Sequence, residues 1–471
     1  MSLPKPEGLQ KEVLALPEKG HYVVLGSAGS GKTTLAILRA VYLSERECDK
    51  DDKVLIVTFN KSLVTYLKHM GLTKLTNIKV ENFHKVARGY LNHKGMLKNG
   101  EIVPTKEYKS NNKLDLIKKA ISEIKGLENG LKRDPEFYCD EIGWIQKMGI
   151  ESIDEYLNAD RVGRKSSRVP RSQRNLIFSL YLKYKEIRER LGFKYDWDDL
   201  GYFMYKALND DKERRMYKHI IIDEGQDFSP VMLRALVKLI PDNGSITFFG
   251  DIAQQIYGSR VSWRSAGINV EKVWKFDQNY RNTKEIAELA IAISNHKYFE
   301  ADQDLVVPKY PRASGPNPAL IKFSSTKKEL GWILDYAVKN SKNSTLAILT
   351  RNRGQVKQIE NLLKDMKVKY QKLSNEMTRW NDKPGVTIGT YHSAKGLEFD
   401  TVMLPFCNKE NIPDKSKLLI CDNREEALSE DIKLIYVSVT RAKRALLMTY
   451  TGEVAEIIPD NKNKIYQEFS L

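Results

Sequence analysis

Residues 26–33, with the sequence GSAGSGKT, have the types and spacing that bind the phosphates of a nucleotide. They fit the pattern GxxxxGK followed by Ser or Thr, and they stand between an apolar run at residues 21–25 and a helix-like run at residues 34–44. In that setting the glycines let backbone N–H groups wrap phosphates, Lys32 reaches the terminal phosphates, and the Thr33 hydroxyl binds Mg²⁺. The segment predicts a nucleoside triphosphate site that uses Mg²⁺.

Two adjacent acids end another apolar run, HIIIDEGQD, and have the chemistry to complete a hydrolytic site. Asp223 would bind Mg²⁺, and Glu224 would act as the base for the attacking water. The alternative is an ordinary strand that ends in an acidic turn, and the neighbouring phosphate loop argues against it. A GTPase is not expected, because Asn60-Lys61 is followed by Ser-Leu and not by the rest of a guanine-reading NKxD motif.

The elements that position these residues follow from the hydrophobic pattern. Short apolar runs alternate with longer stretches of helical spacing, which is typical of parallel α/β layers. Strands are predicted at residues 21–25, 54–58, 219–222, 246–249, 346–349, 386–389, 401–404 and 446–449. Several runs are apolar nearly throughout, as expected for strands covered on both faces.

The spacing between the two motifs predicts an inserted subdomain. Lys32 and Asp223 lie 191 residues apart, about a hundred more than two or three βα units of roughly 30 residues need. The surplus coincides with a region of helical texture without a strong strand. We therefore predict a first α/β domain from residues 1–89 and 191–268, a mostly helical insertion from residues 90–190, and a second α/β domain from residues 269–471.

Composition limits the class of protein. The chain has 471 residues and 77 Lys+Arg against 61 Asp+Glu, a net charge of +16 that suits a polyanionic partner. No apolar run approaches the ~20 residues that span a bilayer, and the N-terminus lacks a signal-peptide pattern, so a cytoplasmic protein is expected. The four cysteines are too widely spaced for a metal clip and are expected to be packing residues.

Further motifs give the chain a family resemblance. In order they are LQKEV, the phosphate loop, VLIVTFNKS, ENFHKVA, YDWDDL, HIIIDEGQD, FFGDIAQQIYG, QNYRN, TYHSAKGLEF and YVSVTRAKRA. Over nearly its whole length the chain resembles the superfamily 1A helicases of the UvrD/Rep/PcrA type. The resemblance implies two tandem RecA-like domains with parallel sheets and an ATP site in the cleft between them.

The resemblance also implies an ATP site with named residues. The nucleotide contacts would be Gln10, Gly26, Ser27, Ala28, Gly29, Ser30, Gly31, Lys32, Thr33, Thr34, Tyr280, Arg281, Glu398 and Arg441. The catalytic set would be Lys32, Asp223, Glu224, Gln254, Arg281 and Arg441, with Thr33 and Asp223 on the metal. Gln10 would read adenine, Tyr280 would stack on it, and Glu398 would bind the ribose. Thr34 stands where the family commonly has an arginine, so base stacking would rely on Tyr280 alone.

Single-stranded DNA would contact a second set of residues. By resemblance these are Thr58, Phe59, Asn60, Phe83, His84, Tyr257, Trp263, Arg264, Thr390 and His392. Aromatic stacking, at about 1–3 kcal/mol per base, grips a strand without reading its sequence. The alternatives remain open: Phe59 and Trp263 could be core residues, and His84 could be a hydrogen-bonded loop histidine.

Three features depart from the pattern of the larger family members. Residues 259–262 add length between Tyr257 and Trp263, and the 109 residues from Arg281 to Thr390 leave no room for a second large insertion. No nuclease domain is expected after Arg441. Residues 161–174 hold six basic residues and no acid, either as a phosphate-contacting face or as a solvated loop.

These features together predict an ATP- and Mg²⁺-dependent motor that moves along single-stranded DNA and separates tailed duplexes, with 3′ to 5′ polarity implied by the resemblance. The alternative is a DNA-binding ATPase that acts as a clamp or sensor for a partner, such as a separately encoded nuclease in repair or defence. An RNA motor stays open as well, since stacking platforms do not read the 2′-OH.

Overall fold

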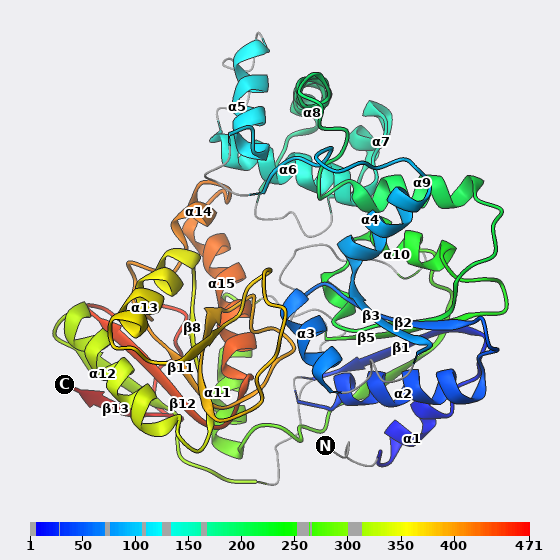
Figure 1. The fold of residues 1–471 in the computed structure, drawn as a ribbon. Helices are drawn as coiled ribbons and strands as arrows, with labels where there is room; N and C mark the ends of the chain where they lie inside the picture. Colours follow the sequence, from blue (N-terminus) through cyan, green and yellow to red (C-terminus); the bar gives the residue numbers. More distant parts are fainter. Residues whose placement is uncertain are drawn as a thin grey trace.

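The computed structural model describes residues 6–27, 29–70, 76–105, 110–124, 133–161, 167–251, 263, 266–299 and 313–471. Its frame consists of two parallel sheets that lie side by side, with a group of helices above both (Figure 1). This arrangement is the predicted pair of RecA-like α/β domains.

The first sheet has six strands in the order β3-β2-β4-β5-β1-β6. They are β1 (Gly20–Gly26), β2 (Lys53–Thr58), β3 (Ile78–Asn82), β4 (Tyr217–Ile222), β5 (Ser245–Gly250) and β6 (Val270–Phe276). Alternate residues of one strand enter different cores: Val54 and Ile56 pack on one face, and Leu55 and Val57 on the other. Burial on both faces explains why these strands are continuous apolar runs.

Helices cover both faces of this sheet. They are α1 (Leu9–Leu14), α2 (Lys32–Arg46), α3 (Lys61–His69), α4 (Phe83–His93), α9 (Leu200–Asp210) and α10 (Pro230–Lys238), with the short 3₁₀ turn η4 (Gly225–Asp227). Asn60 caps α3 by accepting a hydrogen bond from the Ser62 N–H, and Asn82 caps α4 in the same way from Lys85. Both caps start a helix directly after a strand, as the alternating pattern predicts.

The regular elements that the structure describes between residues 94 and 190 are all helical. They are α5 (Lys113–Glu123), α6 (Pro135–Met148), α7 (Ile153–Asn158), the 3₁₀ turn η3 (Arg171–Gln173) and α8 (Arg174–Arg190). They enclose a core of their own that includes Leu116, Ile142 and Tyr184. We call this group of helices the insertion.

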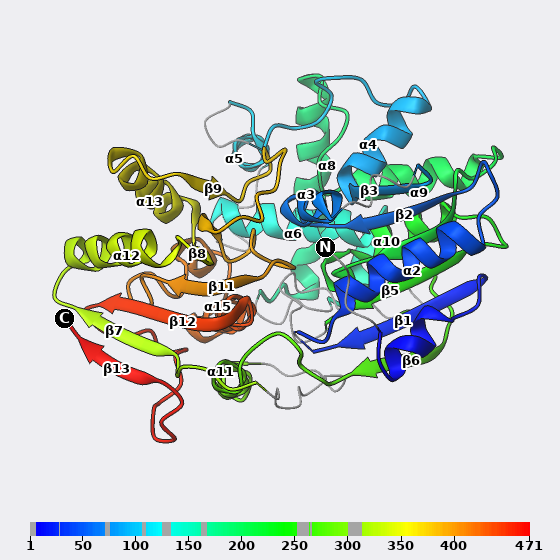
Figure 2. The ribbon, with the colours of Figure 1, turned by 60° about the horizontal axis from the view of Figure 1, so that its bottom comes forward.

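The second sheet has seven strands in the order β13-β7-β12-β11-β8-β10-β9. They are β7 (Ala319–Phe323), β8 (Thr345–Thr350), β9 (Tyr370–Lys372), β10 (Gly385–Thr390), β11 (Phe399–Leu404), β12 (Ala442–Thr451) and β13 (Gln467–Ser470). The helices α12 (Thr326–Asn340) and α13 (Arg353–Asp365) cover one face (Figure 2), while α11 (Lys284–Ser294) and α15 (Arg424–Val439) pack on the other. The short α14 (Lys415–Leu418) precedes α15.

All eight predicted strands are present, and the described residues form five further strands that were not predicted. The first sheet also extends past residue 268, where the pattern predicts its end, because β6 pairs with β1. Apart from that strand, the division into domains stays a prediction. The four cysteines are free, and none of the described helices is long and apolar enough to cross a membrane.

Candidate nucleotide site and nucleic-acid interface

The phosphate loop connects β1 to α2 and depends on glycine. Gly29 and Gly31 have φ values of +80° and +82°, which other residues rarely adopt. A Cβ on Gly29 would collide with the Asn279 side chain and lie 2.9 Å from the Arg281 Cβ. Glycine therefore lets the loop approach the segment that carries Arg281. The predicted contact Ala28 lies outside the described residues.

Lys32 is buried at the start of α2 and bonds to its own loop. Its Nζ donates to the carbonyl oxygens of Gly26 at 2.6 Å and Ser27 at 2.8 Å, and it lies 3.9 Å from Asp251. Burial lowers the pKa of Lys32, while Asp251 and Glu224 oppose that effect. A terminal phosphate would replace these carbonyls as the partner of the ammonium group.

Asp223 follows β4 and carries an oxygen without a partner. Its Oδ1 accepts from the Glu224 N–H at 3.0 Å, whereas the buried Oδ2 has no hydrogen-bond partner among the described residues. Burial and the charge of Glu224 raise the pKa of Asp223 to about 7, and the Thr33 hydroxyl beside it acts in the opposite direction. A hydroxyl next to an unpaired carboxylate oxygen is a donor set that fits Mg²⁺.

The remaining ligands of such an ion would come from phosphate and water. No group of three or more His, Cys, Asp or Glu side chains that could hold a metal occurs in the described part of the chain. Mg²⁺ commonly keeps several waters and takes only one or two carboxylates along with substrate phosphates. Thr33 and Asp223 are therefore sufficient as the protein's share of the site.

Glu224 is held ionised by cations. Burial opposes its ionisation, but Lys395, Arg441 and Lys32 outweigh burial and lower the pKa of Glu224. Its Oε2 accepts from the Gln226 amide at 2.7 Å, and its φ of +54° places a non-glycine residue in the left-handed region. An ionised, oriented carboxylate beside the metal position is suited to accept a proton from water.

Two arginines reach this site from the second domain. Arg281 donates from Nε to Glu398 at 2.7 Å, and its Nη2 lies 2.6 Å from the same carboxylate. Arg441 is 1% exposed. Burial, followed by the charge of Arg281, lowers the pKa of Arg441 to about 10, whereas the charge of Glu224 acts in the opposite direction. Cations of one domain thus face the acids of the other.

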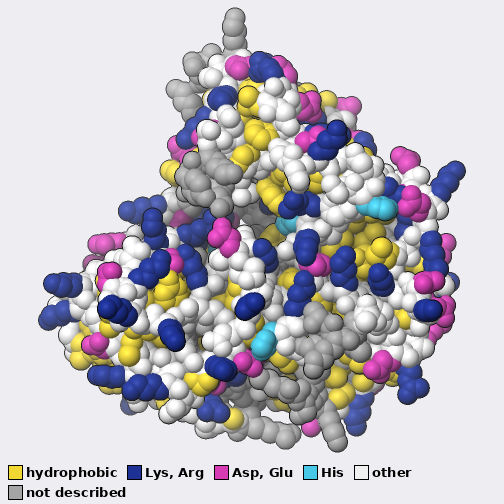
Figure 3. Space-filling view, viewed as in Figure 1, with side chains coloured by type: hydrophobic (Ala, Val, Ile, Leu, Met, Phe, Trp, Pro, Cys, Tyr) yellow, Lys and Arg dark blue, Asp and Glu magenta, His cyan; other side chains and the backbone are white. Residues whose placement is uncertain are grey.

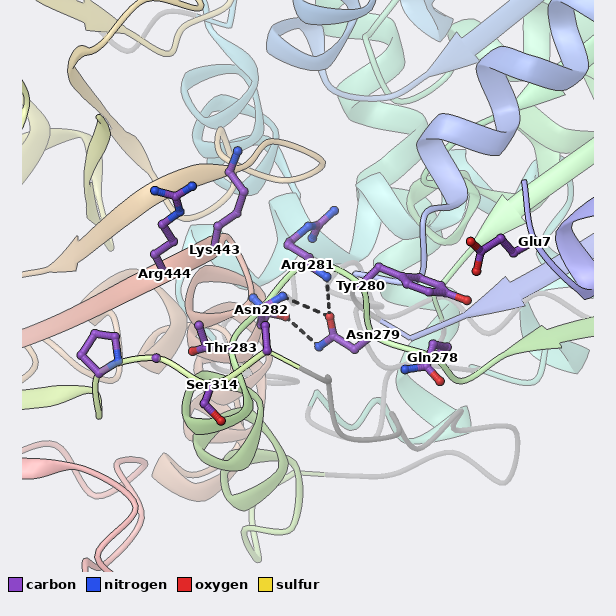
Figure 4. A pocket seen from close by; sticks show the side chains of 13 residues that line it. Glu7, Gln278, Asn279, Tyr280, Arg281, Asn282, Thr283, Ser314, Lys443 and Arg444 are labelled. Atoms are coloured by element: carbon purple, nitrogen blue, oxygen red, sulfur yellow. Dashed lines mark hydrogen bonds between the residues drawn. The ribbon is translucent and has the colours of Figure 1, made fainter. Parts of the chain in front are cut away.

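The segment around Tyr280 lines a pocket of about 740 Å³ (Figure 4). Tyr280 donates its backbone N–H to the Gly29 carbonyl at 2.9 Å; the residue is 59% exposed, and its ring extends toward Glu7 (Figure 4). Gln10 donates to the Ser30 carbonyl at 3.3 Å, so its amide lies against the phosphate loop. An exposed aromatic ring beside that loop can stack on a base.

The other predicted ATP contacts lie around these groups. Ser27 and Ser30 are buried in the loop, Thr34 is half-buried in the first turn of α2, and the exposed Glu398 is bound to Arg281. Gln254 lies outside the described residues.

A second group of residues at the site was not predicted from the motifs. The most prominent is an ion pair of 2.5 Å between Asp227 and Lys395, whose side chains are 2% and 3% exposed. It joins the first domain to the second directly beside Glu224. The sequence SAKGL could have indicated this pair, because its small and apolar neighbours suggest that Lys395 is buried. A buried cation requires an acidic partner.

Hydrogen-bonded amides connect the rest of the site. Gln226 accepts from the Asp251 N–H at 2.9 Å, and Asn279 donates to Asn282 at 2.9 Å. Asn282 in turn donates to the carbonyl of Thr440 at 3.1 Å, just before Arg441. The phosphate loop, the Tyr280 segment and the Arg441 turn are therefore held in one network.

Four of the residues predicted to contact DNA lie at the carboxyl ends of β2 and β3. Phe59 packs edge-to-face on His84 at 5.4 Å, and His84 lies 5.7 Å from the Trp197 ring. Phe59 and His84 are partly accessible, whereas Thr58 and Phe83 are fully buried, and Phe83 belongs to the hydrophobic core. The structure does not bring Phe83 or Thr58 to the surface, because a strand end and a helix start both turn them inward.

Asn60, the fifth predicted contact in this region, bonds to the second domain. Its amide nitrogen donates to the carbonyls of Ser393 at 3.2 Å and Lys395 at 2.9 Å in the second domain. The amide thus bridges the two domains.

Thr390 and His392 are the two predicted contacts in the second domain. The Thr390 hydroxyl accepts from the Ser393 N–H at 3.2 Å. Burial, together with nearby Arg351, Lys417 and other cations, lowers the pKa of His392 to about 3. A neutral histidine among fixed cations is a suitable surface for phosphates.

The third predicted DNA segment is described only at Trp263. Its ring is half-buried and packs edge-to-face on Phe248 at 4.7 Å. Tyr257 and Arg264 lie outside the described residues.

The basic run at residues 161–174 forms internal bonds where the structure describes it. Arg161 pairs with the buried Glu141, Arg171 donates to Asn158 at 2.7 Å, and Arg174 donates to three backbone carbonyls, those of Tyr156, Leu157 and Ala159. Residues 162–166 lie outside the described part. Arg161, Arg171 and Arg174 therefore bond within the insertion, whereas Arg168 is exposed.

Comparison with known proteins gives two family matches. Residues 7–281 match the model of the UvrD/REP helicase N-terminal domain, and residues 274–377 and 370–453 match the UvrD-like helicase C-terminal domain.

Individual relatives are more distant. A probable DNA helicase II homolog of Mycoplasma capricolum is 25% identical over 66% of this chain and 43% of its own length, and DNA helicase II of Escherichia coli is 26% identical over 60% and 39%. The chain spans less than half the length of these curated relatives. Among solved structures, the C-terminal domain of a possible DNA helicase from a Lactobacillus is 20% identical, with a TM-score of 0.30, over 40% of this chain and 98% of that chain.

Proposed function

The chain belongs to the UvrD/Rep family of helicases, and on that premise we propose that it is an ATP-dependent motor that moves along single-stranded DNA and separates duplex DNA. The observation that carries the proposal is the meeting of opposite charges across the domain boundary. Asp223 and Glu224 follow β4 of the first sheet, Arg281 lies between β6 and α11, and Arg441 directly precedes β12 of the second sheet. A site divided in this way is complete only when the two domains are together.

Hydrolysis would use the residues in distinct roles. Glu224 accepts the proton of the water that attacks the γ-phosphorus, and ADP leaves with its own phosphates bound by the loop. Lys32, Arg281 and Arg441 stabilise the charge that grows on the transferring phosphoryl group. Mg²⁺ bound by Thr33 and Asp223 would neutralise phosphate charge. The γ-phosphate is the anion that both domains would bind. Its loss after hydrolysis would therefore destabilise the closed arrangement of the two domains.

The nucleic-acid contacts belong to the same two domains. Asn60 bonds to the segment that carries Lys395, and Lys395 bonds to Asp227 next to the catalytic base. Opening and closing of the cleft would therefore move Phe59 and His84 relative to Thr390 and His392. Alternate gripping by two such surfaces is a means of stepping along a strand, and sequence-tolerant stacking permits it on any sequence. We carry over the 3′ to 5′ polarity from the family resemblance.

Hydrolysis and strand displacement measured on one set of DNA substrates test the proposal. Single-stranded DNA should stimulate ATP hydrolysis, and a duplex with a 3′ tail should be separated in preference to one with a 5′ tail. Stimulated hydrolysis without displacement on either tail would indicate the clamp or sensor instead. RNA of the same sequence, compared in the same assay, decides between a DNA motor and an RNA motor.

A further inference from the structure

Helix α6 spans the space between the two α/β domains (Figure 1). Its 14 residues extend about 21 Å at 1.5 Å per residue. At its C-terminal end, Arg234 of α10 donates to the Met148 carbonyl at 2.6 Å, and Lys147 lies 3.3 Å from Asp198. This end is therefore fixed to the first domain.

The other end of α6 reaches the second domain at one carboxylate. Arg133, two residues before α6, pairs with Asp422 Oδ1, and the Arg168 N–H donates to Asp422 Oδ2 at 2.8 Å. Asp422 lies between α14 and α15, where its own N–H donates to Glu426 at 3.1 Å. Two separate segments of the insertion thus converge on the two oxygens of a single side chain.

The surroundings of this contact support a defined docking geometry. The Arg133 guanidinium lies 4.7 Å from the centre of the Phe137 ring, which orients it toward Asp422. Lys417 in α14 pairs with Glu430 at 2.5 Å, and Glu430, followed by Asp140 on the next turn of α6, raises the pKa of Lys417 against the effect of burial. An acid of α6 therefore lies near a lysine of the second domain. We call Asp422 with Arg133 and the Arg168 N–H the latch.

The proposed DNA contacts of the two domains lie below α6. Lys147 of α6 lowers the pKa of His84, although burial is the larger cause, so this part of the helix lies near the first-domain contact. In the second domain, burial and Arg351 are the larger causes of the lowered pKa of His392, and Lys417, which lies near Asp140 of α6, also contributes. The molecular surface is hollowed between the insertion and the two domains beneath it (Figure 3).

We propose that the insertion and the second domain close a ring around the bound strand, and that the latch must open before a strand without a free end can enter. This inference rests on the proposed function, because it assumes that single-stranded nucleic acid lies between the two domains. A linear strand can thread through a closed ring by its end, but a circular strand cannot. The two latch side chains are 22% and 21% exposed, so salt weakens the contact and permits transient opening.

A reversible cross-link across the latch tests the ring. Arg133→Cys and Asp422→Cys are combined in a background with Cys48→Ser and Cys139→Ser, and the new pair is joined by a cleavable bis-maleimide with an internal disulfide. ATP hydrolysis is then measured with linear and circular single strands of the same sequence. The cross-linked protein should keep its stimulation by linear DNA and lose at least tenfold of its stimulation by circles, and reduction should restore it.

Two results separate the failure of the ring from the failure of the function. Equal stimulation of the cross-linked protein by circles and linear strands would overturn the ring alone. Absence of stimulation by linear DNA in the protein before cross-linking would overturn the proposed function and the ring together.

A single substitution tests the latch without a cross-link and should make entry of circular DNA easier. Asp422→Asn keeps the shape of the side chain and removes its charge, so circular DNA should associate several-fold faster than with the unmodified protein. Asp460→Asn is the matched control, because Asp460 forms an exposed pair with Lys462 at 3.3 Å in the same domain. Identical association rates for the two variants would contradict the role of Asp422.

Discussion

Glu224 is the residue on which hydrolysis should depend, since cations hold it ionised and the Gln226 amide orients it. Glu224→Gln preserves the size of the side chain and removes the base. Turnover of ATP should fall by about 10²- to 10⁴-fold, the usual contribution of a general base, while nucleotide affinity changes little. Steady-state hydrolysis and a nucleotide-binding titration check this. An exposed acid, Glu453→Gln, is the control, and turnover of Glu224→Gln near that of the control would contradict the assignment.

A buried histidine makes stability depend on pH. His219 is fully buried in β4 with Nδ1 2.8 Å from the Ser245 hydroxyl, and burial, followed by the charge of Lys218, lowers its pKa to about 4. The unfolded chain binds a proton near pH 6.5 and the folded one does not. The contribution of the neutral His219 to the free energy of unfolding is therefore complete above pH 6.5. Up to about 3 kcal/mol of stability is lost as the pH falls toward 4.

Denaturant unfolding between pH 4 and pH 8 measures this contribution. His219→Gln should be less stable than the original protein at pH 8, because it disturbs a buried contact, but its stability should fall less on acidification. Parallel pH profiles for the two proteins would show that His219 does not carry the effect.

The contact between α3 and the β9–β10 connection is a feature of elements. Thr65 of α3 donates to the Met377 carbonyl at 3.3 Å, Tyr66 packs on Trp380 at 5.3 Å, and His69 lies 3.2 Å from Asp382. Helix α3 starts beside Asn60, and β10 leads to Thr390. The connection therefore links the segments of the two domains that we propose to contact nucleic acid.

Loss of the aromatic contact should weaken closure of the cleft. An aromatic pair is worth about 0.5–1.5 kcal/mol, so Trp380→Ala should raise the KM for ATP by about 2- to 12-fold if binding requires the closed form. Trp332→Ala is the control, because Trp332 stacks on Tyr336 in α12, away from the first domain. A Trp332→Ala variant with the same increase in KM would exclude a specific effect of the α3 contact.

The success of sequence-based prediction differed between elements for physical reasons. Strands buried on both faces are recognisable apolar runs. β6, with the sequence VEKVWKF, and β13, with QEFS, lie at sheet edges and carry charged or exposed residues, so no such run marks them. Motif order identified the segments near the site, but it did not show that Phe83 turns into the core.

At the scale of the whole molecule, contacts between the domains are the feature that the sequence does not predict. Lys395 and Asp227 are 168 residues apart in the chain and form a buried pair, and Arg133 and Asp422 are 289 residues apart. Periodicity and local motifs carry no information on such pairs. Each proposed catalytic residue lies within a short motif and could be named from the sequence, whereas the contacts that bring the domains together required the fold.

The pair of Asp227 and Lys395 connects the two halves of the molecule, and a double-mutant cycle measures that connection. Removing one partner leaves an unpaired buried charge, so Asp227→Asn and Lys395→Met should each destabilise the protein by about 3–5 kcal/mol. The double variant leaves no isolated charge and should be destabilised by clearly less than the two single effects together. Denaturant unfolding gives the free energies, and strictly additive losses would show that the pair does not couple the domains. Since Lys395 also lowers the pKa of Glu224, Lys395→Met should reduce ATP hydrolysis even where the protein remains folded.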